Sequence, residues 1–367
     1  ARRLAVFSDG NLYEMMSHSL TLVTSGVYTA GNRVCAYAQS GILYFSDGET
    51  IHTSGGNKSG IRYYDPATST AAAPLLISSG TAATIETPAC KALCFYNGQI
   101  LIANIRYVNG TYAKDSALWG NFLDPTTIVG TNIFRVSAGV GGEINCLVPM
   151  GIATSGISPR QAVFVGKSVQ GVSILEGALS TSDLSEKIIN APVGVLDGYT
   201  TKFIPGTEGS GMVLWLGTDR QIHWTNGVNS DVLSNPISKE FSQAITDRLS
   251  ANANARFHAV RDWSNNQYIL DTGIEQSSSK AVAYVFDWQH KYWSRFKGQC
   301  TGFWTEAKND NSENVMYCAT ADSLAQFGVG LYDDETAIAK YWNSGWLSMG
   351  DAELYKQYMW IFGAFRT

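Results

Sequence analysis

The feature that most constrains the fold of this chain is a repeated pattern of a short apolar run, a polar turn with Gly or Asp, and a second apolar run. In one example the apolar residues 93–96 are followed by Asn97 and Gly98 and then by the apolar run at 100–102. Asn-Gly and Asp-Gly favour the positive φ angles of tight turns, so each repeat predicts a β-hairpin. The predicted hairpins lie at residues 4–13, 42–52, 93–102, 163–172, 212–224, 267–286 and 315–327.

These hairpins predict an all-β fold, a β-propeller of about six or seven irregular blades with one short inserted helix. Over the 367 residues each hairpin occupies about 52 residues, near the upper end of the range for propeller blades. Their spacing is irregular, which fits diverged blades with inserted loops better than a strict repeat. A pair of double-sheet sandwiches is the competing architecture.

One helix is predicted from Lys239 to Leu249, where Phe241, Ile245 and Leu249 recur at four-residue spacing. Ser238 is expected to cap its N-terminus. The pattern fits a connector helix packed on a blade, and the sharper alternative is an inserted helix that contacts a neighbouring subunit. The residues that such a contact would use are Lys239, Glu240, Asp247 and Arg248.

The chain is poor in charge, with 16% Asp, Glu, Lys and Arg against about 25% in typical soluble domains. A surface with so few charges is common where a protein faces other subunits. The formal net charge is −5 and no long run of Lys or Arg is present, which argues against a groove that grips DNA. A mildly acidic pore through which DNA slides remains compatible with this composition.

The cysteines and the apolar runs indicate assembly in a reducing compartment without a membrane-spanning segment. No CxxC pair is present, and most cysteines sit in strand-like apolar runs, so buried reduced thiols are expected. No apolar stretch is long enough for a transmembrane helix, no signal peptide is recognised, and both chain ends are expected to continue in the full protein. The cysteines are Cys35, Cys90, Cys94, Cys146, Cys300 and Cys318.

No pattern of catalytic residues emerges, so we predict no enzyme, no metal site and no cofactor. The stretch Ser46-Asp47-Gly48 lacks the spacing and the Trp of a sialidase Asp-box, which leaves only a weak case for glycan cleavage. The abundant aromatics are expected to pack between sheets rather than to form sugar platforms. The histidines, at positions 18, 52, 223, 258 and 290, show no HExxH spacing and are expected to be structural.

Two stretches carry a specific resemblance. In the first, over 256–297, an aromatic residue precedes Asp287 and Trp288, and Trp293 follows; Asp287 is expected to hold the turn and Trp293 to pack between sheets. The second, over 341–347, contains Trp342 and Trp346 in a W-x-S-G-W-L strand. Together they resemble the tail-nozzle, or packaged-DNA-stabilisation, propeller proteins of short-tailed bacteriophages.

This resemblance implies a structural role without catalytic residues. It implies a homo-oligomeric ring, expected to be a hexamer, below the portal and adaptor of the virion tail, assembled in the host cytoplasm. Such a ring retains packaged dsDNA and lets it leave without sequence-specific binding. The expected domains are a propeller over 1–340 and closing strands or a further β segment over 341–367.

Two other functions are compatible with the sequence. One is a glycan-binding or glycan-cleaving propeller such as a receptor-binding tail protein, which predicts a carboxylate or aromatic cluster at one mouth of the propeller. The other is a kelch-type scaffold that binds peptides at its loop face.

Overall fold

In the computed structural model the chain forms two compact units, Ala1–Phe327 and Gly328–Thr367. In the second unit the described strands are β30 (Tyr332–Asp333) and β31 (Thr336–Ala337), which pair antiparallel. The residues that the structure describes are 4–16, 19–54, 57–68, 73–74, 86–121, 124–137, 141–154, 157–180, 183–189, 191–206, 210–275, 280–297, 304–308, 313–319, 324–326, 332–333 and 336–337.

In its described residues the first unit contains seven successive antiparallel sheets, here called blades 1 to 7. Blade 1 comprises β1 (Leu4–Ser8), β2 (Asn11–Met16) and β3 (Ser19–Thr24), and blade 2 comprises β4 (Cys35–Gln39), β5 (Ile42–Ser46), β8 (Arg62–Tyr64) and β9 (Ala73–Pro74). Blade 3 comprises β11 (Ala89–Tyr96), β12 (Gln99–Arg106), β13 (Tyr112–Asn121) and β14 (Asp124–Arg135). Blade 4 comprises β15 (Ile144–Thr154), β16 (Ile157–Lys167), β17 (Val172–Glu176) and β18 (Ser185–Ile189).

The remaining blades follow in the same way. Blade 5 comprises β19 (Lys202–Pro205), β20 (Gly211–Leu216), β21 (Ile222–Thr225) and β22 (Ser230–Val232). Blade 6 comprises β23 (His258–Asp262), β24 (Gln267–Glu275), β25 (Lys280–Asp287) and β26 (Tyr292–Lys297), and blade 7 comprises β27 (Trp304–Lys308), β28 (Asn314–Ala319) and β29 (Leu324–Gln326). A small extra sheet beside blade 2 joins β6 (His52–Ser54), β7 (Asn57–Ser59) and β10 (Glu86–Thr87).

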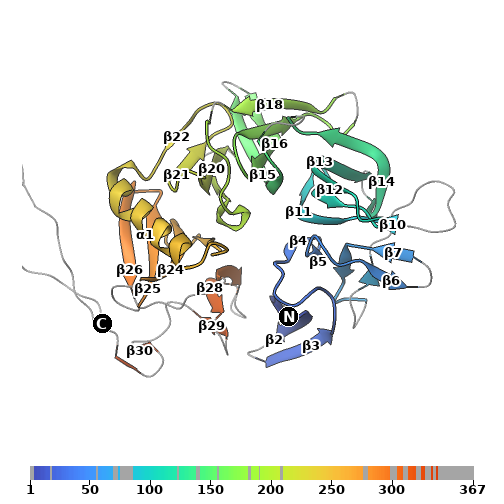
Figure 1. Ribbon diagram of the computed structural model, residues 1–367, viewed down its shortest axis with the longest axis horizontal. Helices are drawn as coiled ribbons and strands as arrows, with labels where there is room; N and C mark the ends of the chain where they lie inside the picture. The colour runs from blue at the N-terminus through green and yellow to red at the C-terminus, as the bar shows by residue number, and fades with distance from the viewer. Residues whose placement is uncertain are drawn as a thin grey trace, which may run out of the picture. The chain divides into compact units, whose positions relative to one another are not determined.

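The connections between these sheets are those of a β-propeller, which confirms the predicted fold class. Within each blade the strands pair in chain order, apart from the excursion in blade 2. The first strands of successive blades contact one another from β4 through β11, β15, β19 and β23 to β27. Figure 1 traces this succession, in which the colour passes from blue to orange from one blade to the next.

Apolar side chains hold the blades together, on both faces of blades 2 to 6 and, in the described residues, on one face of blades 1 and 7. Among the described residues, six buried clusters each join two successive blades. In β12, Ile100 and Ile102 face blade 2 whereas Leu101 and Ala103 face blade 4, because successive residues of a strand point to opposite faces. Burying each such Leu or Ile contributes about 1.5–3 kcal/mol, so every blade depends on its neighbours.

The predicted helix is confirmed as α1 (Ser238–Ala251), the one α-helix in the described part of the chain. It lies in the connection from β22 to β23, and Phe241 and Ile245 are buried in the cluster between blades 5 and 6. The prediction that Ser238 caps the helix was wrong. A 3₁₀ turn at Asn235–Ile237 runs directly into α1, so Ser238 is already helical and Ile237 takes the cap position without a side-chain hydrogen bond.

Six of the seven predicted hairpins are confirmed by strand pairing. The hairpin expected at 42–52 was wrong, because β5 pairs with β4 and β8 while β6 pairs with β7. Asp47 explains the difference. Its carboxylate accepts hydrogen bonds from the backbone of Glu49 and Thr50 and also from the backbone of Thr29 in the loop after blade 1, so the turn is held by another blade.

The turn between β25 and β26 has the predicted geometry. The Asp287 carboxylate accepts hydrogen bonds from the backbone N–H groups of Gln289 and His290, at 2.9 and 2.8 Å. Burial raises the pKa of Asp287, but the hydrogen bonds from His290 and Gln289 outweigh it, so the pKa lies below its usual value. The Trp293 ring packs 5.1 Å from Phe286 and 6.4 Å from Phe241 of α1. One turn therefore ties blade 6 to the helix.

Replacing Asp287 with Ala is expected to lower the free energy of unfolding by about 1–3 kcal/mol, because two turn N–H groups lose a charged acceptor. Because the folded pKa is lowered, the stabilisation by this carboxylate is complete at neutral pH. It is lost as the pH falls below the ordinary value of 3.8 and through the folded pKa. Urea unfolding of both proteins at pH 7 and pH 3 measures this difference. An equal difference at both pH values would contradict the assignment.

Candidate functional site

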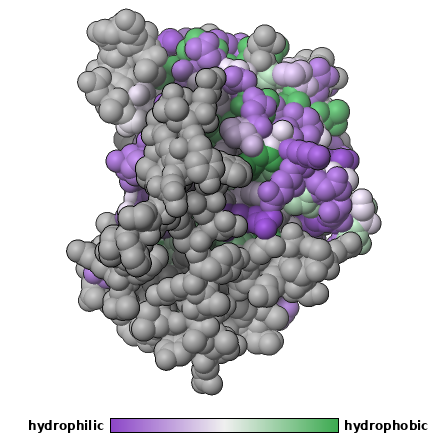
Figure 2. All heavy atoms as spheres, turned by 90° about the vertical axis from the view of Figure 1, so that its left-hand side faces the viewer, coloured by the Kyte–Doolittle hydropathy of each residue, from purple (hydrophilic) through white to green (hydrophobic). Residues whose placement is uncertain are grey.

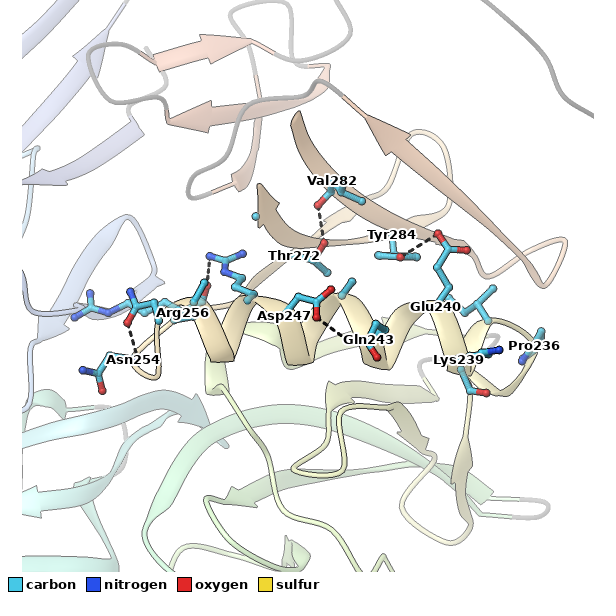
Figure 3. A pocket seen from close by; sticks show the side chains of 18 residues that line it. Pro236, Lys239, Glu240, Gln243, Asp247, Asn254, Arg256, Thr272, Val282 and Tyr284 are labelled. Atoms are coloured by element: carbon cyan, nitrogen blue, oxygen red, sulfur yellow. Dashed lines mark hydrogen bonds between the residues drawn. The ribbon is translucent and has the colours of Figure 1, made fainter. Parts of the chain in front are cut away.

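A groove of about 1240 Å³ runs along α1. One wall is α1 together with the residues on either side of it, from Pro236 to Arg256. The opposite wall comes from blade 6, where Thr272 and Gly273 of β24 lie beside Val282 and Tyr284 of β25. Figure 3 shows these two walls facing each other.

The helix presents an exposed row of polar side chains to this groove. Lys239, Glu240, Gln243 and Asp247 are exposed, and they recur at the three- and four-residue spacing of one helical face. The Gln243 Nε2 donates to Asp247 Oδ1 at 2.7 Å. Figure 2 views the side of Figure 1 on which α1 lies, and hydrophilic residues predominate among the coloured atoms there.

A small network closes the groove at the N-terminal end of the helix. The Glu240 carboxylate forms an ion pair with Arg295 of β26 and accepts a hydrogen bond from the Tyr284 hydroxyl at 3.3 Å. Burial and the neighbouring Glu240 raise the pKa of Tyr284 to about 12. Glu240 is therefore exposed and also anchored to two strands of blade 6, which holds the end of α1 in place.

Arg248, which the sequence grouped with the exposed helix residues, points inward instead. Its guanidinium lies 4.0 Å from Asp271, donates to the carbonyl of Arg256, and stacks 4.9 Å from the Phe257 ring. Gly273 leaves space for this guanidinium because it has no side chain. A Cβ there would lie 2.5 Å from Nη1. Lys239, Glu240 and Asp247 are thus the members of the predicted set available to a partner.

The groove side chains are suited to hydrogen bonding and ion pairing. None of its lining residues is a Cys or His, and its hydroxyl groups have no His beside them in the lining. Within the described ranges no group of three metal-ligating side chains is present, and no described helix is long and apolar enough to span a membrane. The groove therefore presents charged groups and hydrogen-bond donors and acceptors.

A second cluster, the axial clasp, joins three loops that are far apart in sequence. Arg33, before β4, forms an ion pair with Asp197, between blades 4 and 5, with Nη1 at 2.6 Å from Oδ2. The same guanidinium donates to the carbonyl of Phe257, before β23, whose N–H donates to Asp197 at 2.9 Å. Tyr199 completes the cluster, with its ring 4.5 Å below Arg33. The sequence offered no local signal for this contact.

The remaining predicted residues fall into two groups. Trp288 packs against the cluster between blades 5 and 6 and lies edge-on to Trp263 at 6.2 Å. Cys90, Cys94 and Cys146 are buried free thiols as expected, and Cys35 is half-buried. The residues that lie outside the described part of the chain are His18, Cys300, Trp342 and Trp346, and the Cys318 side chain is outside it as well.

No known protein family and no curated protein matches this sequence. Among solved structures, a complex of BBS1N with ARL6DN matches with a TM-score of 0.47 and 11% identity, over 83% of this chain and 80% of that one. The extracellular domain of BT4673 from B. thetaiotaomicron matches with a TM-score of 0.49 and 11% identity, over 92% of this chain and 40% of that one.

Breaking the axial clasp is expected to destabilise the protein strongly. Replacing Asp197 with Asn leaves the partly buried Arg33 without its counter-charge, which is expected to cost about 3 kcal/mol. The double variant with Arg33→Met is expected to lose less than the sum of the two single variants, because the two side chains act as one unit. Chemical denaturation of the four proteins measures this coupling. Additive losses would show that the ion pair contributes nothing of its own.

Proposed function

We propose that this chain is a structural subunit of a short-tailed bacteriophage tail, which assembles with copies of itself into a ring, expected to be a hexamer. The ring lies below the portal and adaptor, retains packaged dsDNA and forms its exit channel. The protein has no catalytic role in this proposal. Its place of action is the virion tail, after assembly in the host cytoplasm.

The observation that carries the proposal is the turn from Asp287 to Trp293 beside α1. The resemblance to tail-nozzle propellers rests partly on this turn, in which Asp287 accepts two backbone N–H groups and Trp293 packs beside Phe241. The turn supports α1, whose exposed row lines the groove. An anchored helix that exposes Lys239 and Asp247 on one face is a suitable contact for an identical neighbour, because charge pairs set the register of an interface.

Composition supports the same proposal. The charged fraction of 16% is low for a free-standing soluble domain, and a net charge of −5 suits a channel through which DNA slides without being held. The apolar side chains near α1 are buried between blades 5 and 6. The α1 groove lies at the surface beside them. A subunit contact through this face would therefore be polar and sensitive to charge.

The proposal is tested by the mass and shape of the purified chain, measured by light scattering and negative-stain electron microscopy. A closed ring with a central hole, or stable docking onto a portal–adaptor ring, is the expected result. A chain that stays monomeric at high concentration and with these partners would contradict it. Retention on a glycan array by such a monomer would favour a receptor-binding propeller instead.

Reversing the charge of the exposed helix row is expected to weaken the ring. Asp247→Lys places a cation near the C-terminal end of α1, where the helix dipole tolerates it, so folding is preserved. The dissociation constant of the ring is expected to rise about tenfold, because two like charges that face each other across an interface repel. Sedimentation velocity over a concentration series measures the change.

The matched control is Lys114→Glu on β13 of blade 3, far along the chain from α1. The Lys114 side chain is 57% exposed, so the control also reverses one exposed charge. It is expected to leave the assembly unchanged. The two variants shift the net charge in opposite directions, so equal weakening by both would show that association does not depend on the α1 face.

A further inference from the structure

The interface between blades 5 and 6 holds two cations that face each other. Lys202 lies on β19, and Ile204, two residues along the same strand, belongs to the cluster between these blades. Arg261 lies on β23, two residues from Ala259 of the same cluster. Because residues two apart share one face of a strand, Lys202 is directed toward blade 6 and Arg261 toward blade 5. The Arg261 guanidinium donates to the carbonyl of Phe203, the residue next to Lys202.

These cations lack an acidic partner at hydrogen-bond distance in the described part of the chain. The Lys202 ammonium makes no hydrogen bond or ion pair there. Arg261 stacks on the Trp263 ring at 4.1 Å, and its Nε is buried without a hydrogen-bond partner. Two unpaired cations in one interface repel each other, and their repulsion is felt more strongly there than in water.

The nearest carboxylates are already engaged. Asp197 is bound by Arg33 and by the backbone of Tyr199 and Phe257, as part of the axial clasp. Glu306 of blade 7 accepts a hydrogen bond from the Trp263 backbone at 3.3 Å. Neither acid forms an ion pair with Lys202 or Arg261, so this part of the interface carries an excess of positive charge.

The excess positive charge contributes to lowered pKa values at Lys202 and His258. Burial and, after it, the neighbouring Arg261 lower the pKa of Lys202 to about 8. Burial, Lys202 and Arg33 together hold the pKa of His258 well below its usual value, so its imidazole is neutral. Its Nδ1 accepts the Trp304 backbone N–H at 3.2 Å. The histidine thus supplies no compensating charge.

We propose that the interface between blades 5 and 6 binds a small oxyanion, a phosphate or a carboxylate, between Lys202 and Arg261. The ammonium supplies a point charge and the guanidinium supplies planar N–H donors, which is the combination that suits such anions. Lys202 as a residue is half-buried rather than fully enclosed, which leaves a small ion a route to the interface. This site is independent of the proposed tail function, because it lies between blades and away from the exposed row of α1.

The experiment is thermal unfolding and isothermal titration calorimetry of the full chain at pH 7, with phosphate, acetate and chloride compared at matched ionic strength. Phosphate, acetate or both are expected to raise the melting temperature saturably above the chloride value. Whichever ion acts at lower concentration identifies the kind of oxyanion preferred. No saturable shift with either ion would overturn the proposal.

Lys202→Met removes the charge at similar length and is expected to weaken anion binding by about tenfold or more, the loss of one charge-assisted hydrogen bond. Without added anion this variant is expected to unfold no more easily than the original chain, because it removes an uncompensated cation. The control Lys114→Met is expected to keep the full anion response. An unchanged anion response in Lys202→Met would overturn the proposal.

A second variant covers a failure of Lys202→Met to fold. Arg261→Lys keeps the charge but removes the guanidinium donors, and it is expected to weaken anion binding while Lys202 remains in place. An unchanged affinity in this variant would overturn the assignment of Arg261. The oligomeric state is measured in parallel, so that failure of the anion site and failure of the ring are seen separately.

Discussion

The structure depends on burying the faces of the sheets against their neighbours, on both sides for blades 2 to 6. Leu101 and Ile102 are adjacent in β12 yet belong to the clusters with blade 4 and with blade 2 respectively. A strand used in this way needs apolar residues at nearly every position, which is why the inner strands read as continuous apolar runs. It also means that the blades depend on one another, since each of blades 2 to 6 supplies half of two described interfaces and blades 1 and 7 half of one.

The apolar side chains of the sheets pack between blades, and the loops at the blade ends make polar contacts. The loop before β4 brings Arg33 to Asp197, and the connection before β23 adds Phe257 to the same clasp. The longer connection from β22 to β23 forms α1 and its groove. The axial clasp and α1 therefore share one origin in the linkers between sheets.

Local patterns predicted the elements whose stability is local. Asn97-Gly98 closes a hairpin, Phe241 and Ile245 mark the buried face of α1, and Asp287 holds its turn, all as expected. The failures came where distant residues intervened. Asp47 bonds a loop from blade 1, and Arg248 turns inward toward Asp271, although both resemble ordinary surface residues in the sequence. The exposed half of the candidate site was predictable, and its buried half was not.

The sequence by itself determined the all-β class, most hairpins, the single helix and the scarcity of charge, because alternation, turn residues and composition act over a few residues. Only the tertiary structure decided which loops meet. The pairing of Arg33 with Asp197 spans 164 residues. Lys202 and Arg261 face each other because one face of β19 packs against blade 6 and one face of β23 packs against blade 5. No short-range pattern encodes such contacts, because they arise from the stacking of whole sheets, and that stacking is driven by apolar burial rather than by the polar residues it brings together.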